Sequence, residues 1–124
     1  YQNAPYFDLS IPYAAGSLSS CADDLMAFDQ ALYSDVLLTE ASINMLFSPI
    51  TENYGYGWEI QQLQVADDPN PLTVVGHAGS TFGFHANLAR VPATRTLAVV
   101  LSNTQPARVR EFSDELMLLM HTKE

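Results

Sequence analysis

Apolar residues recur along the chain with helical spacing first and strand spacing later. The opening residues, 1–16, show no helical period and are expected to be extended or looped. An apolar stripe then predicts a helix from Cys21 to Tyr33. A shorter helical pattern begins at Thr39 and ends before the Ser48-Pro49 pair, since the residue before a proline is unfavourable for helix. The first half of the chain therefore predicts two helices.

From Tyr54 onward the spacing changes to that of strands, separated by segments rich in turn-forming residues. Short connections favour antiparallel neighbours, so these segments predict a four-stranded meander. The last segment is continuously apolar from Leu97 to Leu101, as expected of a strand covered on both faces. The four expected strands are residues 54–63, 72–79, 83–91 and 96–102.

A third helical pattern closes the chain. Pro106 suits the first turn of a helix, and an apolar stripe follows it. The expected fold class is thus α+β: an antiparallel meander of about four strands, a C-terminal helix packed on it, and two N-terminal helices. We expect residues 1–124 to form a single unit without an internal boundary. The stripe consists of Val109, Phe112, Leu116, Leu119 and Met120.

Composition narrows the classes of function. Fourteen acidic residues against five Lys and Arg give a net charge of −9, and the basic residues form no patch, which argues against a nucleic-acid partner. The single cysteine, Cys21, excludes an internal disulfide. No apolar run reaches the length of a membrane span. The chain begins with Tyr1 and shows no secretory leader, which suggests a piece of a longer protein.

Three histidines raise the question of a metal site. His77 and His85 are eight residues apart across an expected turn, and His121 lies on the closing helix. No cysteine or acidic residue completes a ligand set around them. The sequence therefore predicts no metal, and nothing in it indicates a cofactor.

The segment from Gly76 to Phe84 brings together a strand end, a histidine, glycines and a hydroxyl pair. Glycines at this spacing let another group approach the backbone closely. A strand, turn and strand with one buried histidine would explain the same residues, so this segment does not define a site by itself.

Beside the rest of the chain, His77-Ala78-Gly79 resembles the third active-site motif of the class C beta-lactamase and DD-peptidase superfamily, which is often His-x-Gly in the esterase and peptidase branches. Further segments resemble the same family in the same order. The fold implied is the C-terminal portion of a beta-lactamase or transpeptidase-like domain. The matching segments are residues 15–25, 54–58, 99–103 and 106–109.

The resemblance implies acyl transfer, in which a serine attacks an ester or amide carbonyl and forms an acyl-enzyme. In the family the serine and a lysine form a Ser-x-x-Lys motif, and a tyrosine belongs to a Tyr-x-Asn motif. Neither motif is identifiable here, and the only lysine is Lys123. We therefore expect both motifs upstream of this region, and expect the 124 residues alone to be inactive.

The match assigns roles to five residues. The backbone N–H of Ser80 would be one of two donors to the oxyanion. His77 would face the nucleophile, and Gly79 and Ala78 would line the substrate edge, while Asn103 matches a residue that helps to hold a substrate carboxylate. Ala78 lacks the hydroxyl of Lys-Thr-Gly enzymes and His77 lacks a permanent charge. These departures favour an esterase, amidase or D-amino-acid peptidase over a beta-lactamase.

Other interpretations stay open at this point. The parent protein could keep the fold as a non-catalytic binding or sensing module, or the chain could be a product of proteolysis or cloning with no role of its own. The expected partners are a small-molecule or peptide-like acyl substrate and the missing N-terminal part of the domain. A homodimer or strand pairing would also bury exposed apolar surface. The compartment is not determined, although the family is often periplasmic, membrane-attached or secreted.

Overall fold

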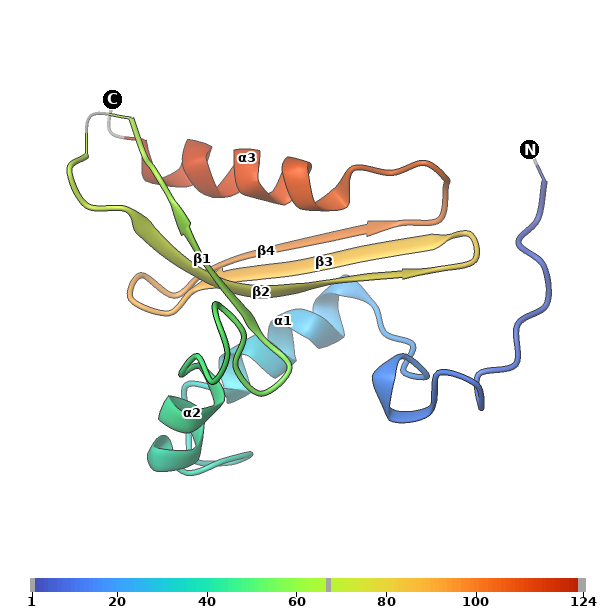
Figure 1. Cartoon of the computed structure of the whole chain (residues 1–124), viewed down its shortest axis with the longest axis horizontal. Helices are drawn as coiled ribbons and strands as arrows, with labels where there is room; N and C mark the ends of the chain where they lie inside the picture. The colour runs from blue at the N-terminus through green and yellow to red at the C-terminus, as the bar shows by residue number, and fades with distance from the viewer. Residues whose placement is uncertain (1, 67, 123–124) are drawn as a thin grey trace.

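Four antiparallel strands form one sheet with helices on both of its faces (Figure 1), which confirms the predicted α+β class. The computed structural model describes residues 2–66 and 68–122. The strands follow one another in the order β1-β2-β3-β4. In chain order the elements are a short 3-10 helix Tyr13–Ala15, α1 Ala22–Ala31, α2 Glu40–Leu46, β1 Glu59–Leu63, β2 Leu72–Thr81, β3 Phe84–Val91, β4 Thr96–Ser102 and α3 Val109–His121.

Two tight hairpins build the centre of the sheet. Phe82 and Gly83 connect β2 to β3, and Gly83 adopts a φ of +79°, a value that glycine reaches without strain. Residues 92–95 connect β3 to β4. The register aligns Val75 with Arg90. Because side chains alternate along each strand, every second residue faces α3 and the others face α1 and α2.

The core lies between the sheet and α3. Its centre is Met117, which is fully buried against apolar side chains from the three strands β2, β3 and β4. Burying one such side chain contributes roughly 1.5–3 kcal/mol. The buried cluster consists of Val74, Ala89, Val91, Ala98 and Met117, with Leu63, Leu72 and Leu116 packed against it.

A buried ion pair holds α1 against the opposite face. Nε of Arg90 on β3 lies 2.7 Å from Oδ1 of Asp29 on α1, and both side chains are almost completely buried, although the two atoms are not aligned as a hydrogen bond. The Arg90 guanidinium also lies over the rings of Tyr33 and Phe47, at 4.6 and 4.8 Å from their centroids. Arg90 therefore ties the segments that follow α1 and α2 to the sheet.

The prediction that β4 is covered on both faces is confirmed, because α3 packs against one face and α1 against the other. The start of the first strand was predicted wrongly. Residues 54–58 form a loop before β1, in which the N–H of Gly55 donates to the carbonyl of Trp58 (2.7 Å) and Gly57 adopts a φ of +78°. This local turn competes with the ladder, so the strand begins only at Glu59.

The predicted face of the closing helix was only partly right, since Val109 is buried and Leu116 packs against the core, whereas the other three residues of the predicted stripe are exposed. The helix begins at Val109 rather than near Pro106, and it buries Val109, Ser113 and Met117. Buried Asn87 on β3 donates to the Ser113 hydroxyl, which helps to fix the rotation of the helix. Phe112, Leu119 and Met120 consequently stay exposed.

Candidate functional site

β2 changes its surroundings half-way along its length, and the candidate site lies at that change. Residues 72–76 pair with β1, and from Val75 onward the strand also pairs with β3. From His77 to Thr81 the strand pairs only with β3 among the described residues, because the register with β1 stops at Gly76. The His77-Ala78-Gly79 motif therefore occupies an open sheet edge.

The hairpin decides which backbone groups face that open edge. In a hairpin closed by two residues, the flanking pair, here Thr81 and Phe84, is hydrogen-bonded, and such pairs then alternate along an antiparallel ladder. His77 and Gly79 therefore direct their backbone groups toward β3. Ala78 and Ser80 direct theirs to the opposite side, beyond the end of β1. Strand geometry thus turns the Ser80 N–H outward.

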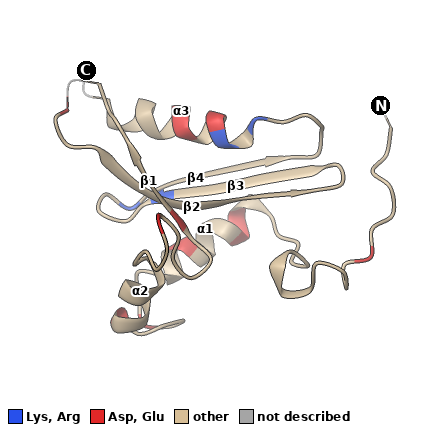
Figure 2. Cartoon of the chain, viewed as in Figure 1, with Lys and Arg blue, Asp and Glu red and all other residues tan. Residues whose placement is uncertain are grey.

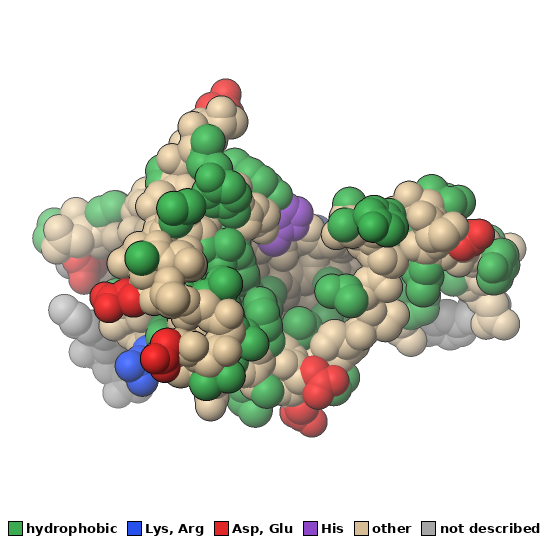
Figure 3. All heavy atoms as spheres, turned by 90° about the horizontal axis from the view of Figure 1, so that it is seen from below, with side chains coloured by type: hydrophobic (Ala, Val, Ile, Leu, Met, Phe, Trp, Pro, Cys, Tyr) green, Lys and Arg blue, Asp and Glu red, His purple; other side chains and the backbone are tan. Residues whose placement is uncertain are grey.

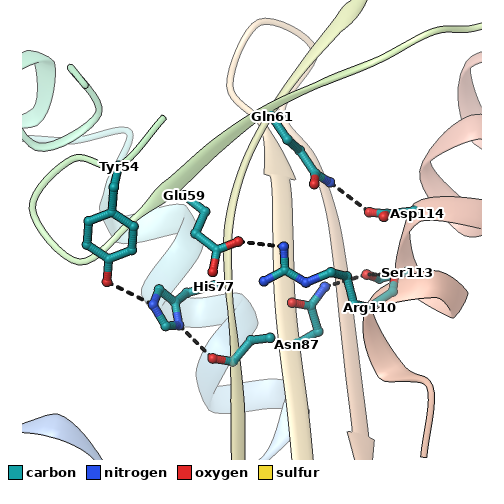
Figure 4. Close-up of polar contacts among 9 residues, drawn as sticks. Tyr54, Glu59, Gln61, His77, Asn87, Arg110, Ser113 and Asp114 are labelled. Carbon is teal, nitrogen blue, oxygen red and sulfur yellow. Dashed lines mark hydrogen bonds and ion pairs between the residues drawn. The ribbon is translucent and has the colours of Figure 1, made fainter. Parts of the chain in front are cut away.

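The His77 side chain is exposed and forms two polar contacts (Figure 4). Its Nδ1 lies 2.6 Å from the carbonyl oxygen of Ala78, and its Nε2 lies 2.8 Å from the Tyr54 hydroxyl. A carbonyl only accepts hydrogen bonds, so Nδ1 carries the proton. In the neutral ring Nε2 is then the acceptor, and the Tyr54 O–H donates to it. The two rings also meet edge to face, with centroids 5.6 Å apart.

Tyr54 was not among the candidates that the sequence suggested. Its position depends on the loop before β1, where its N–H donates to the Thr51 carbonyl (2.9 Å). The neighbouring Gly55 is buried so tightly that a Cβ there would lie 2.6 Å from the Leu46 carbonyl oxygen. Tyr54 and His77 are 23 residues apart, and only tertiary folding brings them together. The glycines beside Tyr54 were the one local signal of a close approach.

The glycine of the motif faces open space. A Cβ on Gly79 would meet no atom of the described residues within 4 Å, and its φ lies outside the left-handed region. Packing therefore does not require glycine at this position. Strand alternation puts Gly79 on the same face as His77, so the missing side chain leaves room beside the histidine for another group.

A second polar cluster lies at the junction of β1 and α3 (Figure 4). Glu59 pairs with Arg110 at 2.5 Å, and the Gln61 amide donates to Asp114 at 2.8 Å. The hydrogen bond from Arg110 lowers the pKa of Glu59; burial opposes this shift, and the Arg110 charge adds to it. Glu59, His77 and Arg110 share the lining of a small cavity of about 10 Å³. These two contacts hold the beginning of β1 against α3.

Asn103, the other predicted substrate contact, lies in the exposed loop after β4. Ser102, its neighbour, is paired with His85, and His85 is paired with Ser80 on the other side. Asn103 and Ser80 therefore lie at the same end of the sheet, two strands apart. Gln105 links this loop to β2, because its side-chain amide donates to the Thr81 carbonyl at 3.1 Å.

The face that carries α1 and α2 is hollowed, with apolar side chains around the hollow and a histidine visible in it (Figure 3). Strand alternation places His77 on this face and His85 on the opposite one. Figure 2 places the few described Lys and Arg residues on β3, in the turn that follows it and at the start of α3. Across residues 2–66 and 68–122, no three His, Cys, Asp or Glu side chains are grouped to hold a metal ion, and no helix is long and apolar enough to span a bilayer.

A sheet flanked by helices on both faces, with a His-x-Gly motif on an open strand edge, is the arrangement expected from the motif resemblance. Comparison with known proteins confirms the resemblance to the family. The family model described as Beta-lactamase matches residues 1–121, so the chain belongs to the Beta-lactamase family. Penicillin-binding protein 4* of Bacillus subtilis (strain 168) is 33% identical over 96 residues, which cover 73% of this chain. The chain spans only 20% of the length of that relative. No solved structure matches this chain.

Proposed function

We propose that this chain forms one wall of the acyl-transfer pocket of a serine hydrolase, whose nucleophilic serine and its lysine partner come from residues outside these 124. The observation that supports the proposal most directly is the open edge of β2 beside His77. Family membership supports the serine-hydrolase class, and the lack of a Ser-x-x-Lys motif in this sequence is consistent with a nucleophile from outside it.

The Ser80 N–H supplies one half of the oxyanion hole in this proposal. A tetrahedral intermediate carries negative charge on the former carbonyl oxygen, and a fixed backbone donor stabilises that charge without reorganisation. The strand ladder holds this donor rigidly, because Gly79 and Thr81 on either side are bonded to β3. The nucleophile's own N–H would supply the second donor.

His77 and Tyr54 position a proton at the same edge. With Nδ1–H fixed on the Ala78 carbonyl, the Tyr54 hydroxyl donates to Nε2 and keeps its oxygen lone pairs available. The hydroxyl can then accept a hydrogen bond from the serine or from a polar group of the substrate. We assign Tyr54 and His77 jointly to this role, which neither Ala78 nor Gly79 can fill.

The substrate class follows from the polarity of this edge. Ala78 contributes no hydroxyl, and His77 bonded in its neutral form contributes no fixed positive charge toward a carboxylate. We therefore propose an ester, amide or D-amino-acid peptide as substrate, with a beta-lactam turned over poorly. Asn103, at the same end of the sheet, is the proposed contact for an anionic group of the substrate.

The test uses the 124-residue chain and a longer form of the protein that includes the residues before Tyr1. The chain alone is expected to form no covalent adduct with a fluorescent penicillin or a fluorophosphonate, and to leave p-nitrophenyl acetate unhydrolysed. The longer form is expected to become labelled on serine. Labelling of a serine in the chain alone, or an unlabelled longer form that still binds the penicillin, would argue for a different function; the second result identifies a binding module.

A further inference from the structure

Glu59 is the position at which three parts of the molecule meet. Its backbone forms an isolated antiparallel bridge with Tyr54, and it begins the ladder of β1 opposite Gly76, the residue before His77. Its carboxylate lies on the face of the sheet opposite His77 and pairs with Arg110 of α3 at 2.5 Å. Figure 4 shows Glu59 between Arg110 on one side and the contact of Tyr54 with His77 on the other. The start of β1 therefore sets the separation of Tyr54 and His77.

The loop that carries Tyr54 is closed by its own hydrogen bonds. The Tyr54 N–H donates to the Thr51 carbonyl (2.9 Å), and the Ile60 N–H donates to the Asn53 carbonyl (2.7 Å). The second of these bonds ties the loop to the residue that follows Glu59. A loop closed in this way moves as one piece with the start of β1, so a displacement of Glu59 is passed on to Tyr54.

The strand that carries His77 has little freedom to follow such a displacement. A Cβ on Gly76 would lie 2.4 Å from the Leu88 carbonyl oxygen, which shows how tightly β2 is packed against β3 at this point. Glu59, His77 and Arg110 share the lining of a cavity of about 10 Å³, which is near the lower limit for one water molecule. The free space between these groups is thus too small to absorb a shift of β1.

Arg110 is fixed on its own side of the sheet. Asn87 on β3 donates to the Ser113 hydroxyl, and this hydroxyl donates to the Arg110 carbonyl at 2.9 Å. The first turn of α3 is therefore tied to β3, the strand that also pairs with β2. A cation in the first turn of a helix opposes the helix dipole, so helix formation does not favour an arginine at this position. The contact with Glu59 offsets that cost.

We propose that Arg110 is a positioning residue for the Tyr54 hydroxyl, acting through Glu59 from the face of the sheet opposite His77. The inference rests on the proposed acyl transfer, in which this hydroxyl presents its lone pairs to the serine or the substrate. The pair with Arg110 holds the start of β1 so that the Tyr54 hydroxyl stays 2.8 Å from Nε2 of His77. Without the pair the loop moves away from β2. A partly exposed ion pair contributes little to stability, but a reacting group is sensitive to small displacements.

The contact between the Tyr54 and His77 rings reports this geometry without an activity assay. In the 124-residue chain the two rings meet edge to face with centroids 5.6 Å apart, so their protons should show a nuclear Overhauser effect. Arg110→Gln should weaken this signal, because the loop is no longer held. The double variant Glu59→Arg, Arg110→Glu reverses the ion pair and should restore the signal. Arg108→Gln removes the same charge from an exposed neighbour and should leave the signal unchanged.

The rate of labelling by a fluorophosphonate tests the consequence in the longer form of the protein. Arg110→Gln should slow labelling by about tenfold, since the reaction is sensitive to the position of the hydroxyl, and the reversed pair should recover most of the rate. Glu115→Gln, which changes an exposed acidic residue of the same helix, is the matched control. Circular dichroism verifies that each variant is folded.

Two results would overturn the inference. One is a ring signal that Arg110→Gln leaves unchanged, and the other is an unchanged labelling rate in a variant whose ring signal is weakened. Failure of the proposed function looks different, because the unsubstituted longer form would then resist labelling. The role of Arg110 in acylation falls with it in that case, even if the ring signal depends on Arg110.

Discussion

The two halves of β2 share one backbone geometry and have opposite surroundings. Residues 72–76 pair with β1, Val75 and Gly76 pair with β3 as well, and Val74 and Val75 are buried. Residues 77–81 pair on one side, and four of the five are exposed. A glycine in each half shows the difference, because a Cβ on Gly76 would lie 2.4 Å from the Leu88 carbonyl oxygen and a Cβ on Gly79 would meet nothing. One half of the strand serves packing, and the other leaves polar groups free for chemistry.

The largest expected effect concerns the ion pair of Asp29 with Arg90, which lies opposite Val75 in the buried half of β2. Asp29→Ala leaves the buried Arg90 charge without its partner, so we expect a loss of about 3–5 kcal/mol in the free energy of unfolding. Burial raises the pKa of Asp29 in spite of the opposing effect of Arg90, and some of the ion pair's benefit is offset accordingly. Urea denaturation measures the change. The exposed neighbour Gln30→Ala is the control, and equal losses in both variants would contradict this account.

Gly76→Ala should destabilise the chain by about 1–3 kcal/mol, because the new methyl group overlaps backbone that the ladder holds in place. Gly79→Ala should change the free energy of unfolding by less than about 0.5 kcal/mol. Thermal unfolding of the two variants gives the comparison directly. A similar melting temperature for both would mean that the two halves of β2 are not distinct.

In the longer form of the protein, Gly79→Ala should reduce activity more than Gly76→Ala does, which is the reverse of their expected effects on stability. Gly79→Ala fills the space beside His77, and we expect acylation to slow by about tenfold or more, which corresponds to about 1.4 kcal/mol in the barrier. The rate of labelling by a fluorophosphonate measures it. An unchanged rate in a fully folded Gly79→Ala protein would show that residues 77–81 of β2 do not line the proposed pocket.

Tyr54→Phe removes one hydroxyl and keeps the edge-to-face contact with His77. We expect a loss of about 1 kcal/mol or less in stability, since the hydrogen bond is exposed to water. The acylation rate of the longer form should fall by more than the small loss of stability explains, because the proposed proton position is lost. Tyr56→Phe, two residues away and also exposed, is the matched control. Equal effects in the two variants would assign Tyr54 a structural role only.

A small effect on stability is also expected at Glu59, whose pair with Arg110 is about one-third exposed. Glu59→Gln should cost less than about 1 kcal/mol at neutral pH. The pKa of Glu59 is lowered in the folded state, so its contribution is present above the unfolded value of 4.5 and disappears as the pH falls through the folded value. The difference in melting temperature between the two proteins should therefore vanish on acidification below that value. A difference that persists there would rule out the ion pair as its source.

Local patterns sufficed for most of the fold. The alternation in residues 72–102 and the Thr39 cap, whose hydroxyl accepts from the Ser42 N–H, gave three strands and a helix at nearly the observed boundaries. The rotation of α3 could not be predicted, because it depends on the hydrogen bond between Ser113 on α3 and Asn87 on β3. Hydrophobicity alone selected Phe112 and Leu119, which are exposed.

The residues of the candidate site, too, could be predicted only in part from the sequence. The His77-Ala78-Gly79 motif was visible in the sequence because its residues are consecutive. Tyr54 was not, since its contact with His77 exists only after α2 and the following loop have placed it. The open edge at Ser80 was implied only by the family resemblance, because it is produced by the point at which β1 stops pairing, and no residue type marks that point.

The short hairpins have a consequence for the order of folding. β2, β3 and β4 are joined by connections of two and four residues, so they can find one another with little loss of chain entropy. The contact of Asp29 with Arg90 closes a loop of about sixty residues and becomes favourable only once β3 exists. We expect the meander to form early and α1 to dock late, so that the surface bearing His77 acquires its final shape in the last step of folding.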